Sequence, residues 1–428
     1  MRRAPAWDGE ATTASPERAA PGERPERWIP EWSNAVFSLS ERDRRWRSVR
    51  ALMARSGIDV IVCLPCTNSH GRGQADAHYL TQLGENSDET TVAFPIDGEV
   101  TAWHSRGGVW PSSNWFSDIR SAGRGSGGET VAGWLQDHPE FEASTIAIAG
   151  LDASVLAHVR AAEGEVNWQS VEILKRRFPD ARFVSATPIL GEARWRKSPE
   201  EIAFLRTATG VAEQTLAAVD QHARPGVAER TVFAHMMYAN AAAGGSFTPM
   251  IGWSSGPDGR AYHRLEQPSF RTCEAGDVLM LEIEGRYGGY ISQIDQTFAI
   301  GFARQLLGDA VALAIEAFNR VLDTARPGVT FGELIDAAAV TALDGRASVG
   351  LGAHGRGTGD DGPLVVAGRP SPDDVRNLRL EEGCVFAIKP SATIDGIADF
   401  ARWGDSIVVT STGAERLGTR AQELRVLA

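Results

Sequence analysis

The chain repeats itself, and this repeat limits the folds that it can adopt. Residues 223–227 read Ala-Arg-Pro-Gly-Val, and residues 325–329 read the same. Apolar residues at three- and four-residue spacing precede and follow each copy, over residues 200–222, 229–243, 306–324 and 331–343. Each half therefore reads as a helix, a Pro-Gly turn, a second helix and then strands. This order predicts a duplicated domain.

A second pair of matching segments carries opposite charges. Each segment begins with a glycine, continues through an apolar run of strand length and reaches a charge six residues later. Gly276 leads to Glu282 in this way, and Gly383 leads to Lys389. Such a run is typical of a strand buried on both faces, where a charge is costly unless it is paired. We therefore expect Glu282 and Lys389 to pair with each other, either as part of an active site or as a purely structural ion pair.

Length and charge exclude several classes of protein. A chain of 428 residues predicts two or more domains. Its 43 basic and 55 acidic side chains give a net charge of −12, which argues against nucleic-acid and membrane-surface partners. No apolar stretch reaches the length of a membrane span, and the start lacks the apolar segment of a signal peptide. We expect a cytoplasmic protein, and four cysteines do not indicate a disulfide framework.

The rest of the chain divides into three parts. Residues 1–33, rich in Pro, Glu, Arg, Ala and Ser, are expected to be a disordered or partner-packing tail. Residues 34–190 alternate helical and strand patterns, including a hairpin around Asp97-Gly98, and predict an α/β domain. Residues 188–197 are expected to link it to the duplicated domain, which takes in residues 191–428.

Several motifs resemble those of one family. Residues 197–202 read Lys-Ser-Pro-Glu-Glu-Ile, and residues 353–355 read Ala-His-Gly. With the two repeated turns and Tyr79-Leu80-Thr81, they are similar in type and order to motifs of the creatinase/aminopeptidase P family, the pita-bread fold. The resemblance implies an α/β (α+β) fold class: a creatinase-like N-terminal α/β domain followed by a duplicated pita-bread domain. It also implies a homodimer.

The resemblance exposes a departure at the metal site. Peptidase members of the family hold two metal ions with two Asp, one His and two Glu. The matching positions here are Glu282, Gln293, His354, Lys389 and Gly404. Only Glu282 and His354 offer a metal ligand, and the Lys389 ammonium would repel a cation. We therefore expect no metal and no other cofactor, and we expect Lys389 to fill the vacated cation position. We also expect the protein to lack peptidase activity.

Metal-free members of this fold suggest another chemistry. Creatinase hydrolyses a C–N bond with a histidine as proton shuttle, and His263 resembles that residue. Asp295 falls where creatinase places a substrate-binding glutamate. The resemblance thus implies a metal-independent hydrolase of a small polar metabolite, with C–N hydrolysis favoured. The expected catalytic residues are His263, Glu282, Asp295, His354 and Lys389.

Further residues are expected to contact the substrate. In this subunit they are Trp253, Arg260, Tyr262, Gln293, Arg356 and Trp403. In the dimer implied by the resemblance, His70, Arg72 and His78 would face the partner's pocket. Two other functions stay open: a lyase of this family that cleaves C–S, C–C or C–N bonds, and a non-catalytic pita-bread module that binds a ligand. A binding module would have no need of His263.

Overall fold

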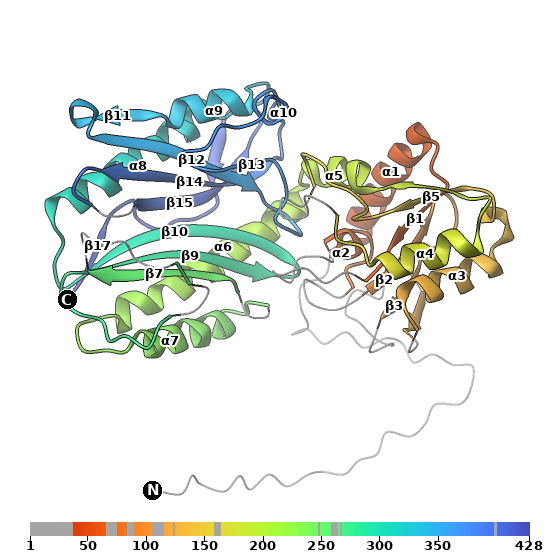
Figure 1. The fold of residues 1–428 in the computed structure, drawn as a ribbon, viewed down its shortest axis with the longest axis horizontal. Helices are drawn as coiled ribbons and strands as arrows, with labels where there is room; N and C mark the ends of the chain where they lie inside the picture. Colours follow the sequence, from red (N-terminus) through yellow and green to blue (C-terminus); the bar gives the residue numbers. More distant parts are fainter. Residues whose placement is uncertain are drawn as a thin grey trace, which may run out of the picture. The chain divides into compact units, whose positions relative to one another are not determined.

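Two β-sheets organise the part of the chain that the structure describes (Figure 1). This computed structural model describes residues 37–65, 75–83, 90–104, 115–122, 125–157, 164–246, 249–257, 264–265, 268–397 and 400–428. The expected tail of residues 1–33 lies outside these ranges. A mixed sheet with helices precedes a duplicated, largely antiparallel sheet, so the expected α/β (α+β) fold class is confirmed.

The first sheet has six strands in the order β4-β3-β2-β1-β5-β6. They are β1 (Val60–Cys63), β2 (Thr90–Pro95), β3 (Thr101–His104), β4 (Asp118–Ser121), β5 (Thr145–Ile148) and β6 (Arg182–Ser185). The expected hairpin is present, because β2 and β3 pair antiparallel. Helix α4 (Trp168–Arg177) connects β5 to β6, which pair parallel.

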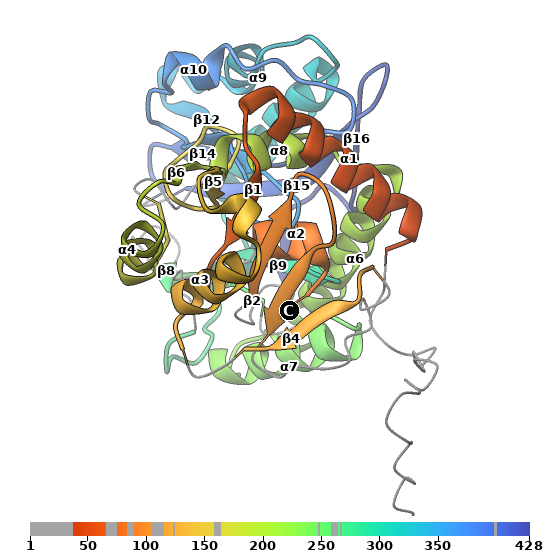
Figure 2. The ribbon, with the colours of Figure 1, turned by 90° about the vertical axis from the view of Figure 1, so that its right-hand side faces the viewer.

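Helices cover both faces of this sheet (Figure 2). Alternate strand residues face opposite sides, so Ile61 joins one apolar cluster while Val60 joins the other. Helices α1 (Leu39–Ser56), α2 (Ala75–Thr81) and α5 (Thr187–Trp195) pack in the first cluster, and α3 (Gly127–Asp137) and α4 in the second. Along the described ranges, no helix is both long and apolar enough to cross a membrane.

Local sequence defines the ends of α1. The Ser38 hydroxyl accepts a hydrogen bond from the Glu41 amide and so caps the first turn. At the other end Gly57 adopts a φ of 62°, a left-handed conformation that favours glycine and ends the helix.

The expected linker at residues 188–197 is wrong for most of its length, because α5 occupies Thr187–Trp195. Pro188 lies in the first turn, where a missing amide hydrogen costs nothing. Ile189, Leu190 and Ala193 then bury one face of the helix. Burial of this face outweighs the loop preference of Pro and Gly.

The second sheet has eleven strands and follows the duplicated sequence. Its main path runs β11-β12-β14-β15-β10-β9-β7-β8, while β13, β16 and β17 pair with β12, β15 and β10. The main-path strands are β7 (Ile251–Pro257), β8 (Arg264–Leu265), β9 (Asp277–Tyr287), β10 (Tyr290–Ile300), β11 (Val340–Ala342), β12 (Ala347–Gly355), β14 (Val385–Ile394) and β15 (Ala401–Val409). The side strands are β13 (Leu364–Val365), β16 (Ala414–Arg416) and β17 (Arg425–Leu427).

Each repeat supplies a helix that packs on its own strands. Helix α6 (Pro199–His222) lies on β9 and β10, and α8 (Gln305–Thr324) lies on β14 and β15 (Figure 1). The second helices are α7 (Glu229–Ala242) and α9 (Phe331–Ala338), and a short α10 (Asp373–Arg376) follows. Pairing of β10 with β15 joins the two repeats in one sheet.

The repeated glycines share one backbone conformation. In the two Ala-Arg-Pro-Gly-Val turns, Gly226 has a φ of 89° and Gly328 a φ of 88°. Before the two matching strands, Gly276 has a φ of 90° and Gly383 a φ of 87°. A side chain is strained at these angles, so the turn geometry explains why glycine stands at all four positions.

The second helix of the second repeat is shorter than expected. The helical pattern predicted residues 331–343, but α9 ends at Ala338 and Val340–Ala342 form β11. Val340 pairs with Val349 at the edge of the sheet. The β-branched residues in this segment favour the strand.

Residues 78–79 connect α2 to the C-terminal half of the same chain. The Tyr79 hydroxyl donates to the Ala193 carbonyl at 3.0 Å. The His78 ring lies beside the β9–β10 turn, with Nε2 3.2 Å from the Gly288 carbonyl oxygen. His78 is buried, so the expectation that it faces a partner's pocket is wrong. Burial lowers the pKa of His78 to about 4.

We predict that His78 makes the fold sensitive to acid. Its folded pKa lies below the ordinary value of 6.5, so the unfolded chain binds the proton more tightly. Its contribution to stability is complete above pH 6.5 and is lost as the pH falls toward 4. Between pH 7.5 and pH 5, wild type should lose about 2 kcal/mol more unfolding free energy than His78→Gln. Urea unfolding of both proteins at the two pH values measures this, and equal losses would contradict it.

Candidate active site

Five neighbouring strands direct a cluster of charged and polar side chains to one face of the second sheet. The strands are β9, β10, β15, β14 and β12, which are consecutive in the sheet. The cluster consists of Glu282, Gln293, Asp295, His354, Lys389 and Arg402. Residues between these positions point to the other face. Ile283, Ile294 and Ile388 lie there in apolar clusters with the helices.

The Lys389 ammonium lies at the centre of this cluster. Its Nζ is 3.1 Å from each of three acceptors: Glu282 Oε1, Gln293 Oε1 and His354 Nε2. An ammonium carries three N–H donors, so each donor has one acceptor. The pairing of Glu282 with Lys389 that their matching positions predicted is therefore present.

Arg402 is a second cation in the cluster, and the sequence analysis did not identify it. Its Nη1 lies 3.5 Å from Glu282 Oε2 and 3.6 Å from Asp295 Oδ2. Its Nε donates to Ser391 Oγ at 2.7 Å. Strand periodicity offered a signal, because Arg402 is two residues from Gly404 and Ser391 is two residues from Lys389.

His354 is held as a neutral ring. Its Nδ1 is 2.9 Å from Asp360 Oδ1 and 3.1 Å from its neighbour's carbonyl, that of Gly355. Burial lowers the pKa of His354 to about 4, against the opposing effect of Asp360. Both partners of Nδ1 are acceptors, which indicates that Nδ1 carries the proton. Nε2 then lies 3.1 Å from Lys389 Nζ, a donor, and 2.9 Å from Gln293 Oε1. The ring therefore orients the ammonium.

Arg356 does not contact the surface, which corrects its expected role in substrate binding. Its side chain is fully buried and lies 3.2 Å from both Glu284 and Asp360. Glu284 also pairs with Arg286 at 3.0 Å. Together these residues form a buried ionic network behind His354, whose parts are stabilised by one another's charges.

The expected tryptophans belong to the core. Trp253 is buried with Phe233 in the apolar cluster under α6 and α7. Trp403 is buried against Phe318 of α8, with ring centroids 4.9 Å apart. A residue in a strand can face either side, and both tryptophans face the helices. They do not line the charged cluster, so the expectation that they contact substrate is wrong.

Five expected site residues fall outside the described ranges. They are His70, Arg72, Arg260, Tyr262 and His263. Their predicted roles, including the proton transfer assigned to His263, stay predictions.

The residues of the cluster do not fit a pair of divalent metal ions. Within the described ranges, no three His, Cys, Asp or Glu side chains are grouped so that they could hold one. The Lys389 ammonium lies where Glu282, Gln293 and His354 converge. A divalent ion about 3 Å from it would be repelled by roughly 10 kcal/mol at an effective dielectric constant of about 20.

The backbone also closes one of the expected ligand positions. A Cβ atom added at Gly404 would lie 2.7 Å from the Ile388 carbonyl oxygen and 3.3 Å from the Asp295 Cβ. A carboxylate side chain at this position would require the strands to shift. The local packing thus agrees with the loss of a ligand at Gly404.

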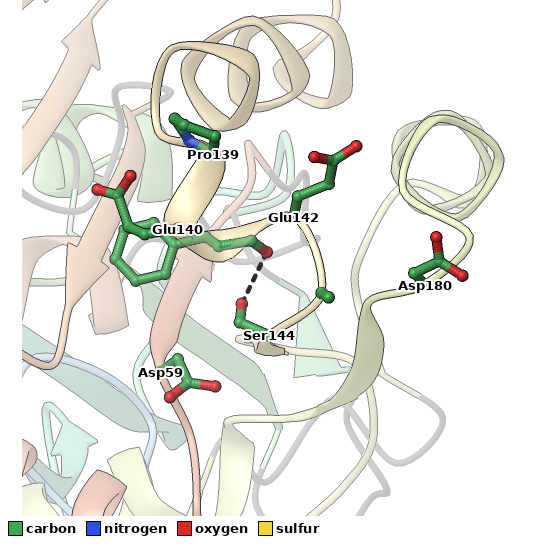
Figure 3. Close-up of a pocket in the computed structure, with 8 residues that line it drawn as sticks. Asp59, Pro139, Glu140, Glu142, Ser144 and Asp180 are labelled. Atoms are coloured by element: carbon green, nitrogen blue, oxygen red, sulfur yellow. Dashed lines mark hydrogen bonds between the residues drawn. The ribbon is translucent and has the colours of Figure 1, made fainter.

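An acidic surface pocket lies elsewhere, in the N-terminal half (Figure 3). It is lined by Asp59, Pro139, Glu140, Phe141, Glu142, Ala143, Ser144 and Asp180. Asp59 accepts a hydrogen bond from the Thr145 amide at 2.8 Å. The carboxylates of Glu140, Glu142 and Asp180 are exposed and do not converge on one point (Figure 3). This pocket is therefore not a candidate site.

We predict that Lys389→Met destabilises the fold by about 3–5 kcal/mol, because it leaves a buried carboxylate without its nearest cation. The double variant Lys389→Met/Glu282→Gln removes that carboxylate charge as well and should lose less stability than the single variant. Urea unfolding at pH 7.5 measures both. If the double variant is at least as unstable as the single one, the ion pair does not stabilise this site.

The C-terminal half is similar to known proteins. Residues 203–411 match the model of metallopeptidase family M24. The probable dipeptidase PepE of Mycobacterium tuberculosis is 32% identical over 254 residues, which are 57% of this chain and 64% of that protein. The Xaa-Pro dipeptidase of Pyrococcus furiosus is 26% identical over 266 residues, which are 61% of this chain and 74% of that protein.

Solved structures extend the likeness of fold over most of the chain. The dipeptidase PepE of Mycobacterium ulcerans has a TM-score of 0.67 at 23% identity and covers 92% of this chain and 100% of its own. The X-Pro aminopeptidase of Thermotoga maritima has a TM-score of 0.67 at 18% identity, over 89% of this chain and 99% of its own.

These relatives correct the expected function. Metal-independent hydrolysis of a small polar metabolite, without peptidase activity, was inferred from the lost ligand positions. The relatives are named dipeptidases and Xaa-Pro dipeptidases instead, so that inference is wrong. The described chain has the fold of these proteins, and its residues 203–411 match the model of the metallopeptidase family M24.

Proposed function

We propose that this protein is a peptidase that hydrolyses short peptides, with dipeptides as its substrate class. The observation that carries the proposal is the match of residues 203–411 to a peptidase family, supported by relatives named dipeptidases. The charged cluster of β9, β10, β12, β14 and β15 lies in this same range. The likeness to PepE spans 64% of that protein's length. Dipeptidase activity is therefore a proposal for this chain.

The cluster offers positive charge to a peptide carbonyl. Hydrolysis of a peptide bond places negative charge on the carbonyl oxygen in the transition state, and fixed positive groups stabilise it. Lys389 and Arg402 are the two cations of the cluster, and their side chains keep 11% and 15% of their exposure. We assign them to this role, with Glu282 and neutral His354 as residues that position Lys389.

The proposal includes a departure from the family. The positions that hold metal in peptidase members carry Gln293, Lys389 and Gly404 here, and we propose that this chain lacks the family's set of metal ligands. The homodimer, the domain boundary near residue 190 and the cytoplasmic location stay predictions.

A panel of dipeptides, with and without proline in second position, tests the proposal. Each is incubated with the full-length protein, both with and without added Mn²⁺, and the released amino acids are quantified. We predict cleavage of at least one dipeptide. A folded protein that cleaves none of them in either condition would contradict the proposed function.

Variants locate the activity. Arg402→Leu should lower kcat/KM for the cleaved dipeptide by about 100-fold, the effect of losing one group that stabilises the oxyanion. Arg402→Lys should restore part of it, because a positive charge returns. Glu142→Gln, in the acidic surface pocket, is the control and should leave kcat/KM unchanged. Equal activity of Arg402→Leu and wild type would remove Arg402 from the site.

A further inference from the structure

The Glu282 carboxylate lies between two side-chain cations. Its Oε1 is 3.1 Å from Lys389 Nζ, and its Oε2 is 3.5 Å from Arg402 Nη1. One carboxylate therefore bridges an ammonium and a guanidinium. This arrangement places two positive charges side by side in a buried polar site, at positions supplied by neighbouring strands.

The first cation has the surroundings of a bound ion. Glu282, Gln293 and His354 direct three acceptor atoms at Nζ, each at 3.1 Å. A divalent transition metal needs donor atoms at about 2.0–2.3 Å. Because the ammonium occupies the point where the acceptors converge, a metal ion could bind there only after Lys389 moved away.

The second cation is held by a separate set of contacts. Arg402 Nη1 lies between Glu282 Oε2 and Asp295 Oδ2, at 3.5 Å and 3.6 Å. Its Nε donates to Ser391 Oγ, and its guanidinium lies 4.5 Å from the centre of the Phe400 ring. A guanidinium over an aromatic face is attracted by the ring. Several groups therefore hold Arg402 in place.

The charges of the cluster balance without a metal. Glu282 and Asp295 contribute two negative charges, and Lys389 and Arg402 contribute two positive ones. A divalent ion would add two positive charges with no further carboxylate to offset them, which is unfavourable in a buried site.

We propose that Lys389 and Arg402 take the place of the family's two metal ions, and that this site consequently excludes divalent metals. The inference concerns the cations of the site and stands whether or not dipeptides are the substrate. Its test therefore measures bound metal and not activity.

Metal uptake tests the inference directly. The full-length protein is incubated with excess Co²⁺, dialysed and analysed for cobalt. Its visible absorption, at about 500–650 nm, is recorded as a sign of ligand-bound Co²⁺. We expect far less than about one ion per chain in wild type. Stoichiometric cobalt in wild type that His354→Gln removes would overturn the inference, because the ion would then lie in this cluster.

A variant in which a carboxylate and a neutral amide replace the two cations gives a positive result with which wild type can be compared. Gln293→Asp, Lys389→Glu and Arg402→Gln together remove both cations and add carboxylates beside Glu282 and His354. Gly404 is left unchanged because the backbone closes that position. We expect this triple variant to bind about one Co²⁺ per chain or more. A folded triple variant that takes up no more cobalt than wild type would overturn the inference.

The control variant keeps both cations. Gln293→Asp alone adds a carboxylate but retains Lys389 and Arg402, so it should bind no more cobalt than wild type. It also tests the site if the triple variant does not fold, since cobalt bound by Gln293→Asp would show that the two cations do not exclude the metal.

Discussion

The buried carboxylate of Glu282 imposes the main constraint on this structure. An ionised carboxylate removed from water is unstable without cations or hydrogen bonds. Lys389, Gln293 and Arg402 supply them from three neighbouring strands. Every strand that contributes must therefore hold its register, because a shift of one residue would turn these side chains to the apolar face.

The duplication explains how the two charges meet. Each repeat supplies a helix that covers the outer, apolar face of its strands, and β10 pairs with β15 at the junction. Glycines with φ near 90° precede the matching strands, at Gly276 and Gly383. Because both strands start from a glycine of the same conformation, residues at the same distance from that glycine lie at equivalent positions in the sheet. Glu282 and Lys389 thus approach each other from the two halves.

The sequence was sufficient for the duplicated fold and for the central ion pair. Repeated turns and matching strand frames predicted both. Arg402 was not predicted, since a single arginine in a strand has no repeat to mark it. Trp253 and Trp403 were assigned to the site because aromatic residues suit ligands, but the side of the strand that faces the helices depends on register.

Prediction of the function from the sequence meets a different limit. The expected loss of ligands at Gln293, Lys389 and Gly404 concerns the site and does not describe the substrate. The substrate class was inferred from that loss, and the dipeptidase relatives corrected it. Likewise, residues 188–197 were expected to form a linker, where apolar burial forms α5. In both cases a local feature was weighed without its surroundings.

A crystal structure of the protein grown in Mn²⁺ tests the central claim most directly. An anomalous difference map identifies manganese independently of any interpretation of side chains. The account predicts no anomalous peak between Glu282, Gln293 and His354, and density for Lys389 Nζ within hydrogen-bond distance of all three. A manganese peak at that point, with Lys389 turned away, would contradict it.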